Sequence, residues 1–145
     1  MKRFLIVAAI ASVAATAVYA QGDVIAQRRD LMKAVGGATR DPGAMLKGEM
    51  PFDLAKVQRS LAVYSDSASK LPGLYPDTSK TGGETTAAPK VWEDAAGFKA
   101  SLAKFDSEAK AAAAAIKDEA SFKAAFPNVL KNCGTCHETY RVKKS

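Results

Sequence analysis

Two cysteines and the only histidine of the chain lie together near its C-terminus. Cys133, Cys136 and His137 form the pattern C-x-x-C-H, with the small residues Gly134 and Thr135 between the thiols. Thiols three residues apart lie on nearly one face of a helix, where both can reach the two vinyl groups of one haem. The histidine that follows would supply a proximal ligand to the iron. The spacing predicts one haem c per chain, covalently bound through Cys133 and Cys136 and ligated by His137.

Three other interpretations of the cysteine pair compete with haem attachment. A redox-active dithiol usually follows a strand in a βαβ unit, and the sequence shows no such strand. A structural disulfide would leave the adjacent histidine without a role. Chance placement of the histidine after the second cysteine, in a helical bundle that carries no haem, is the third alternative. A structural zinc site is disfavoured, because it takes four ligands and the motif holds every Cys and His of the chain.

The residue on the other side of the iron decides what such a haem does. Because the chain has a single histidine, ligation by two histidines is excluded. The methionines beyond the N-terminal segment are Met32, Met45 and Met50. Met32 lies on the apolar face of a predicted helix, whereas Met45 and Met50 fall in the loop expected after it. Spacing alone does not decide between Met32 as an iron ligand and Met32 as a core residue.

The elements that must position these residues are helices. Apolar residues recur at three- and four-residue spacing over about 23–35, 53–71, 89–116 and 121–143, and no segment alternates as a strand would. Such sustained spacing predicts helices packed lengthwise at a shallow angle. We therefore expect an all-α fold, an antiparallel four-helix bundle with the haem attached to its last helix. The most regular seam, in the third segment, consists of Val91, Ala95, Phe98, Leu102, Phe105, Ala109, Ala112 and Ile116.

Turn-forming residues set the expected ends of these helices. The pair Gly36 and Gly37 is expected to end the first helix, and Asp53 is a predicted N-cap of the second. Pro127 is expected to kink or break the fourth helix. The segment 72–88 is long, polar and rich in glycine and threonine, which is typical of a functional loop.

The first 20 residues have the pattern of a signal peptide. Lys2 and Arg3 precede an apolar run, and small residues end at Ala20, a suitable cleavage site. The run is shorter than the roughly 20 residues that a bilayer span needs, so an uncleaved anchor is the less favoured alternative. We expect residues 1–20 to be removed, which leaves 21–145 as one exported, periplasmic domain with no integral membrane span.

The composition argues against several other classes of protein. The chain has 145 residues, 21 Lys+Arg and 15 Asp+Glu, and a net charge of +6. Its charges are interleaved as on solvated helix faces, and only residues 141–145 are a basic cluster, so nucleic-acid binding is disfavoured. A catalytic scheme that needs two histidines is excluded. No acid–base pair stands out in the sequence, and an enzyme is therefore disfavoured.

Several motifs together resemble the class II cytochromes c, the cytochrome c′ family. Residues 133–141 are similar to that family's C-x-x-C-H-x-x-Y-R ending, at the C-terminus of an all-helical exported chain. Residues 47–53 (KGEMPFD) resemble the start of its second helix, and residues 88–92 (APKVW) resemble the start of its third. Arg28 matches the family's first-helix arginine. The resemblance covers residues 22–143 and implies a four-helix bundle that carries haem c.

The resemblance also implies roles for two residues of the first helix. In this family the residue four positions after the arginine faces the distal side of the iron. High-spin members carry a non-ligating residue there, and the low-spin branch carries a methionine that binds the iron. This chain has Met32 at that position, which implies Met32 as the distal ligand opposite His137. Arg28 would contact a haem propionate, since guanidinium binds carboxylate bidentately, and a surface salt bridge is the alternative.

These features predict a periplasmic monohaem cytochrome that carries electrons between redox partner proteins. Ligation by histidine and methionine raises the reduction potential, and docking to a partner would be weak and salt-sensitive. If Met32 does not ligate, the alternative is a five-coordinate haem protein that binds NO or CO on an open distal side. The sequence does not distinguish a monomer from a homodimer.

Overall fold

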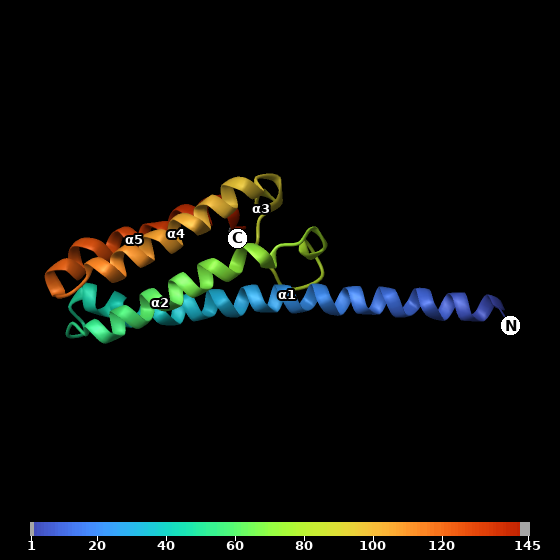
Figure 1. Ribbon diagram of the computed structural model, residues 1–145, viewed down its shortest axis with the longest axis horizontal. Helices are drawn as coiled ribbons and strands as arrows, with labels where there is room; N and C mark the ends of the chain where they lie inside the picture. Colours follow the sequence, from blue (N-terminus) through green and yellow to red (C-terminus); the bar gives the residue numbers. More distant parts are fainter. Residues whose placement is uncertain (1, 143–145) are drawn as a thin grey trace.

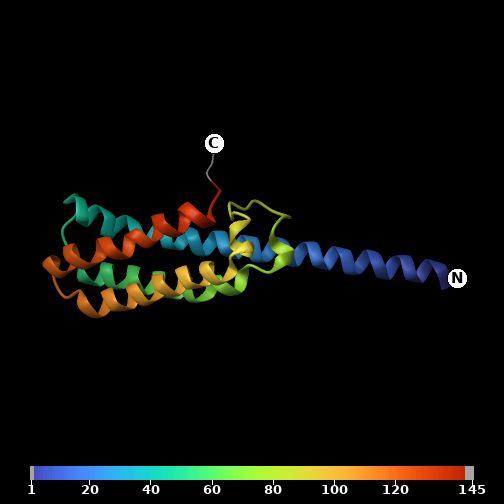
Figure 2. The same cartoon turned by 90° about the horizontal axis from the view of Figure 1, so that it is seen from above.

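Four long helices make up the fold (Figure 1). The computed structural model describes residues 2–142, with side chains from Val24 onward. Successive long helices run in opposite directions; α2 packs against α1 and α4, and α4 packs against α5 (Figures 1 and 2). The predicted all-α, antiparallel four-helix bundle is confirmed. In chain order the elements are α1 (Lys2–Lys47), α2 (Leu54–Lys70), the 3-10 turns η1 (Leu71–Leu74) and η2 (Asp77–Ser79), α3 (Lys90–Glu93), α4 (Ala95–Ala115) and α5 (Glu119–Tyr140).

The first and last helices of the bundle are not packed against each other as closely as the other neighbours are. Along the described chain, few residues of α1 have their Cα atoms close to those of α5. Many more do so between α1 and α2, between α2 and α4, and between α4 and α5. Figure 1 shows the α4/α5 pair diverging from α1 toward the end of the bundle where the C-terminus lies.

The first helix is longer than its sequence pattern predicts. The prediction that Gly36 and Gly37 end it is wrong, because a glycine pair permits a left-handed turn without imposing one. The helix ends at Lys47, directly before Gly48, whose φ is +75°. Met45 consequently lies inside α1 rather than in a loop.

A proline inside α1 is compensated by a side chain of α2. Pro42 is fully buried and has no N–H to donate to the carbonyl oxygen of Ala38, four residues earlier. The hydroxyl of Ser60 donates to that oxygen instead, at 2.7 Å. The helix therefore continues through the proline without leaving a buried carbonyl unpaired.

Pro127, expected to kink or break the last helix, does not break it, since α5 runs through it to Tyr140. The carbonyl that the proline leaves without a helical partner belongs to Lys123, an exposed residue where water can take the missing place. A capping box starts the helix, in which the Ser121 N–H donates to the Asp118 carboxylate at 2.8 Å and the Asp118 N–H donates to the Ser121 hydroxyl at 3.1 Å.

The predicted third helix is divided in two. Asp94, with φ −128° and ψ 55°, separates α3 from α4, and its carboxylate accepts from the N–H of Gly97 at 3.1 Å. Aspartate favours this N-cap role over a place inside a helix, which is the physical reason for the division. Asp53 caps α2 in the same way, as predicted, by accepting from the N–H of Lys56 at 3.0 Å.

The apolar interior consists of two clusters. The predicted seam of the third segment is buried except for Ala95, which is exposed. Tyr64 lies at the centre of the larger cluster, and its ring centroid is 5.4 Å from that of Phe105 and 6.1 Å from that of Phe126. The larger cluster comprises Val35, Met45, Val57, Leu61, Tyr64, Ala68, Phe105, Ala109, Ala112, Ile116, Phe122, Phe126 and Val129, and the smaller comprises Leu71, Val91, Phe98, Leu102 and Tyr140.

The N-terminal part of α1 extends well beyond the other helices (Figures 1 and 2). In the part of the chain that the structure describes, no helix combines the length and the apolar character that crossing a membrane requires. The predicted signal peptide at residues 1–20 stays a prediction; residue 1 lies outside the described residues.

Candidate functional site

A cavity of about 540 Å³ lies between α1, α4 and α5 at the end of the bundle near the C-terminus. Pockets for small molecules and cofactors commonly have volumes of about 300–1,000 Å³. Much of its wall is apolar, with contributions from Ile25, Val35, Phe98 and Leu102. The structure brings every predicted site residue to this one wall: Arg28, Met32, Cys133, Cys136 and His137.

The last helix presents the two thiols to the cavity. Cys133 and Cys136 are free and half-buried. Burial raises the pKa of both thiols, and the neighbouring Cys133 raises that of Cys136 further. A redox-active dithiol depends on a lowered thiol pKa, so this apolar environment argues against that alternative.

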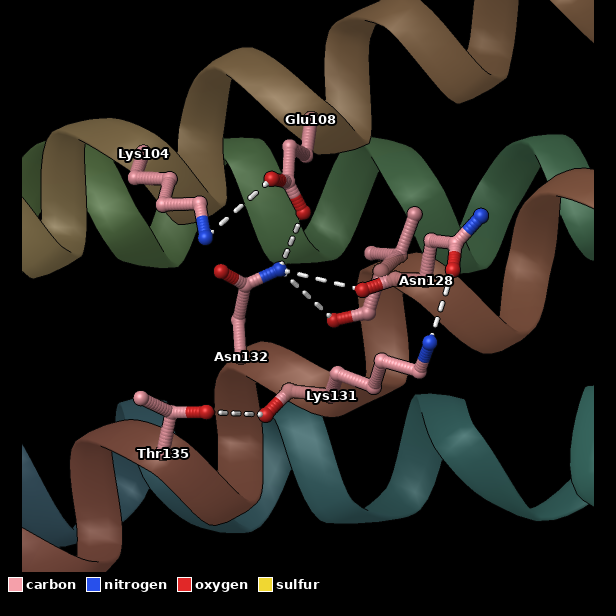
Figure 3. A network of polar contacts seen from close by, with 7 residues as sticks. Lys104, Glu108, Asn128, Lys131, Asn132 and Thr135 are labelled. Atoms are coloured by element: carbon pink, nitrogen blue, oxygen red, sulfur yellow. Dashed lines mark hydrogen bonds and ion pairs between the residues drawn. The ribbon is translucent and has the colours of Figure 1, made fainter.

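A polar network joins α5 to α4 and limits the rotation of α5 about its axis (Figure 3). Asn132 is buried, and its amide nitrogen donates to the Glu108 carboxylate of α4 at 2.5 Å and to the main-chain oxygens of Asn128 and Val129. Successive side chains on a helix point about 100° apart. Asn132 is directed at α4, and the next residue, Cys133, lines the cavity.

His137 is half-buried on the same wall. Burial lowers the pKa of its imidazole, and the positive charge of Arg141 lowers it further. Both effects favour the neutral imidazole, which is the form that binds a metal ion. Its main-chain oxygen accepts from the N–H of Arg141 at 3.3 Å, which closes the last turn of α5.

Met32 is the one methionine at the cavity among the described residues. It is half-buried on the α1 side of the wall, across from the helix that carries the C-x-x-C-H motif. Met45 is 3% exposed within the larger apolar cluster, and Met50 packs against that cluster. The structure therefore leaves Met32 as the one described thioether available on the α1 side of the cavity.

Arg28 is a buried cation at the cavity wall, with an exposed fraction of 4%. It donates to the hydroxyl of Ser79 at 3.2 Å and to the main-chain oxygen of Ser79 at 3.1 Å. Its guanidinium carbon lies 4.5 Å from the ring centroid of Tyr75. Burial lowers its pKa, and among the described residues no carboxylate lies within ion-pair distance of it. A surface salt bridge therefore does not describe this arginine.

Sequence reasoning missed the residues that the 72–88 loop contributes. Tyr75, Thr86 and Ala87 line the cavity. The loop is fastened to the end of α5, where the Val142 N–H donates to the Thr86 oxygen at 2.8 Å. Length and composition marked this segment as functional, but no local pattern identifies which of its residues reach the cavity.

The residues at the cavity fit a haem. Two thiols at the spacing for thioether bonds lie beside an imidazole, and a thioether sulfur lies on the opposite helix. The charged side chains of the wall are the three arginines Arg28, Arg29 and Arg141, and no carboxylate of the described chain lines it. An apolar cavity with a cationic margin suits a flat apolar macrocycle that carries two propionates.

Comparison with known proteins gives the same result. The family model described as cytochrome c′ matches residues 23–141. The chain is 55% identical over 126 residues to a cytochrome c′ of Rhodopseudomonas palustris, and this match covers 87% of this chain and 86% of the relative. It is 41% identical over 131 residues to cytochrome c-556 of Agrobacterium fabrum, and this match covers 90% of this chain and 88% of the relative.

Solved structures show the same fold. Cytochrome c′ from Rhodopseudomonas palustris superposes with a TM-score of 0.83 at 54% identity, covering 85% of this chain and 98% of the other. The NMR-validated structural model of oxidised cytochrome c556 from Rhodopseudomonas palustris superposes with a TM-score of 0.76 at 33% identity, with the same coverage. With its motif, its cavity and these relatives, the chain belongs to the cytochrome c′ family and is a monohaem c-type cytochrome, an electron-transfer protein with covalently bound haem c.

Proposed function

We propose that this cytochrome is a periplasmic electron carrier with a six-coordinate haem iron. Cys133 and Cys136 form the thioether bonds, His137 is the proximal ligand and Met32 is the distal ligand. The observation that carries the proposal is the position of Met32 on the cavity wall, while the other described methionines pack elsewhere. The bound haem supplies the Fe(II)/Fe(III) couple.

The chain's own residues tune that couple. The thioether of Met32 favours the reduced iron and so raises the potential. Ile25, Val35 and Leu102 are apolar side chains that exclude water from the cavity. The exclusion of water raises the reduction potential further. Redox partners would dock weakly near the margin of the cavity, where Arg29 and Arg141 are exposed, so association should weaken at high salt.

Arg28 is the residue proposed to hold a haem propionate, because it is a buried cation without a carboxylate partner in the described chain. We expect Arg28→Gln to lower the reduction potential, because a propionate without its cation stabilises the oxidised iron. The expected shift is about 50 mV, close to the 59 mV that corresponds to a tenfold change in the equilibrium constant for one electron. Arg40→Gln, which changes an exposed arginine of α1 that does not line the cavity, is the control. Equal potentials for the two variants, measured by spectroelectrochemical titration, would refute the contact.

The second candidate function is a five-coordinate cytochrome that binds NO or CO. It is favoured by the higher identity to a cytochrome c′ than to the cytochromes c-556. In that case Met32 would pack beside the iron without binding it, and the distal side would be open to small gases.

Visible spectra of the reduced protein with and without CO test the proposed function. A six-coordinate iron gives a low-spin spectrum that CO changes slowly and incompletely, because the gas must displace Met32. Immediate, stoichiometric binding of CO by a high-spin ferrous form would overturn the electron-carrier proposal in favour of the second candidate.

A further inference from the structure

One carboxylate joins the start of α4 to the end of α5. The hydroxyl of Tyr140 donates to one oxygen of the Asp94 carboxylate at 2.9 Å. The other oxygen of the same carboxylate accepts from the N–H of Gly97 and caps α4. Tyr140 is 9% exposed and lines the cavity, one helical turn after His137. The bond therefore links the turn of α5 that carries the histidine to a fixed point on another helix.

Gly97 gives this bond the space it needs. A Cβ atom at position 97 would lie 2.7 Å from the Tyr140 hydroxyl oxygen and 2.5 Å from the Asp94 oxygen that accepts the hydrogen bond from Tyr140. Glycine is a poorer helix former than alanine, and the rest of α4 is rich in alanine. The close approach of two polar atoms accounts for a glycine at this position of a helix that otherwise favours alanine.

Two further contacts hold the same turn. The ring of Tyr140 packs edge-on against Phe98, with centroids 5.3 Å apart. The main-chain oxygen of Tyr140 accepts from the N–H of Ala88 at 2.9 Å, which ties the turn to the 72–88 loop. Removal of the hydroxyl alone would leave both contacts in place, so the hydrogen bond to Asp94 can be tested separately from packing.

We propose that Tyr140 is a positioning residue for the proximal ligand: its hydrogen bond to Asp94, in the space left by Gly97, fixes the orientation of the His137 imidazole toward the iron. The inference rests on the proposed role of His137. Because ring orientation and ligand basicity tune a bound metal, loss of the hydrogen bond changes the electronic structure of the iron without removing the ligand.

The test compares Tyr140→Phe with the wild-type holoprotein. We expect altered g-values in the electron paramagnetic resonance spectrum of the ferric form, which report the axial ligand field. We also expect a change of about threefold to tenfold in the equilibrium constant for electron exchange with a reference donor, the scale of one hydrogen bond. Gly97→Ala, which keeps Tyr140 and Asp94 but displaces them, should change both quantities in the same direction.

A matched control separates positioning from stability. Asp118→Ala removes a helix cap at the opposite end of α5, a change that typically lowers the stability of the fold. It should leave the g-values and the exchange equilibrium as in the wild type. If Tyr140→Phe also lowers only the stability, the bond is merely structural and the proposal is overturned. Failure of the proposed role of His137 would show separately, as a wild-type spectrum without an imidazole ligand.

Discussion

Replacing Met32 with alanine is expected to convert the haem iron from a six-coordinate, low-spin state into a five-coordinate, high-spin state. Met32 is the one described methionine on the cavity wall, so no other thioether of the described chain can take its place. The absorption spectrum of the variant should become high-spin in both oxidation states, and its ferrous form should bind CO immediately and stoichiometrically. The reduction potential should fall, because the thioether that favours ferrous iron is lost.

The matched control for this substitution is Met45→Leu. Met45 lies on the same helix but is buried in the larger apolar cluster away from the cavity. A swap of similar volume there typically costs less than 1.5 kcal/mol of stability and should leave the spectrum unchanged. A low-spin spectrum retained in Met32→Ala would show that Met32 is not the distal ligand.

The second large effect is expected from the thiols. The double variant Cys133→Ala, Cys136→Ala should contain no covalently bound haem, because both thioether bonds are removed. After expression with the maturation machinery, a denaturing gel stained for haem should show a band for the wild type and none for the double variant. Each single variant keeps one thiol on the cavity wall, and should give a weaker band with a shifted haem spectrum.

Thr135→Ala serves as the control for the double variant. Thr135 lies between the cysteines but is exposed, and its hydroxyl donates to the main-chain oxygen of Lys131 rather than to any group of the cavity. It should retain a full haem band. A haem band of wild-type strength in the double variant would contradict covalent attachment through these residues.

The bundle could be predicted from the sequence because burial follows the helical period. The ends of its helices could not be predicted as well, since distant residues decide them. Pro42 remains inside α1 because Ser60, on another helix, supplies the missing hydrogen bond. Gly36 and Gly37 stay helical within a long helix that packs against α2. In each case tertiary contacts prevail over a local preference.

The candidate site shows the same division between local and distant information. The thiols and His137 form a continuous motif that is recognisable in the sequence, whereas the proposed role of Met32 rests on family resemblance. The Ser79 partner of Arg28 lies 51 residues away, and the Asp94 partner of Tyr140 lies 46 residues away. No periodic pattern predicts such pairs, because they depend on tertiary structure. The 72–88 loop brings Ser79 to α1, and the break between α3 and α4 brings Asp94 to α5.

The separation of the interior into two clusters bears on the order of events during maturation. The larger cluster, centred on Tyr64, draws on all four long helices and includes hardly any of the cavity wall. The attachment motif lies at the other end of the bundle, in the last turns of the last helix. The half that holds the larger cluster can therefore assemble from its own aromatic packing, before the thioether bonds proposed for the other half are made.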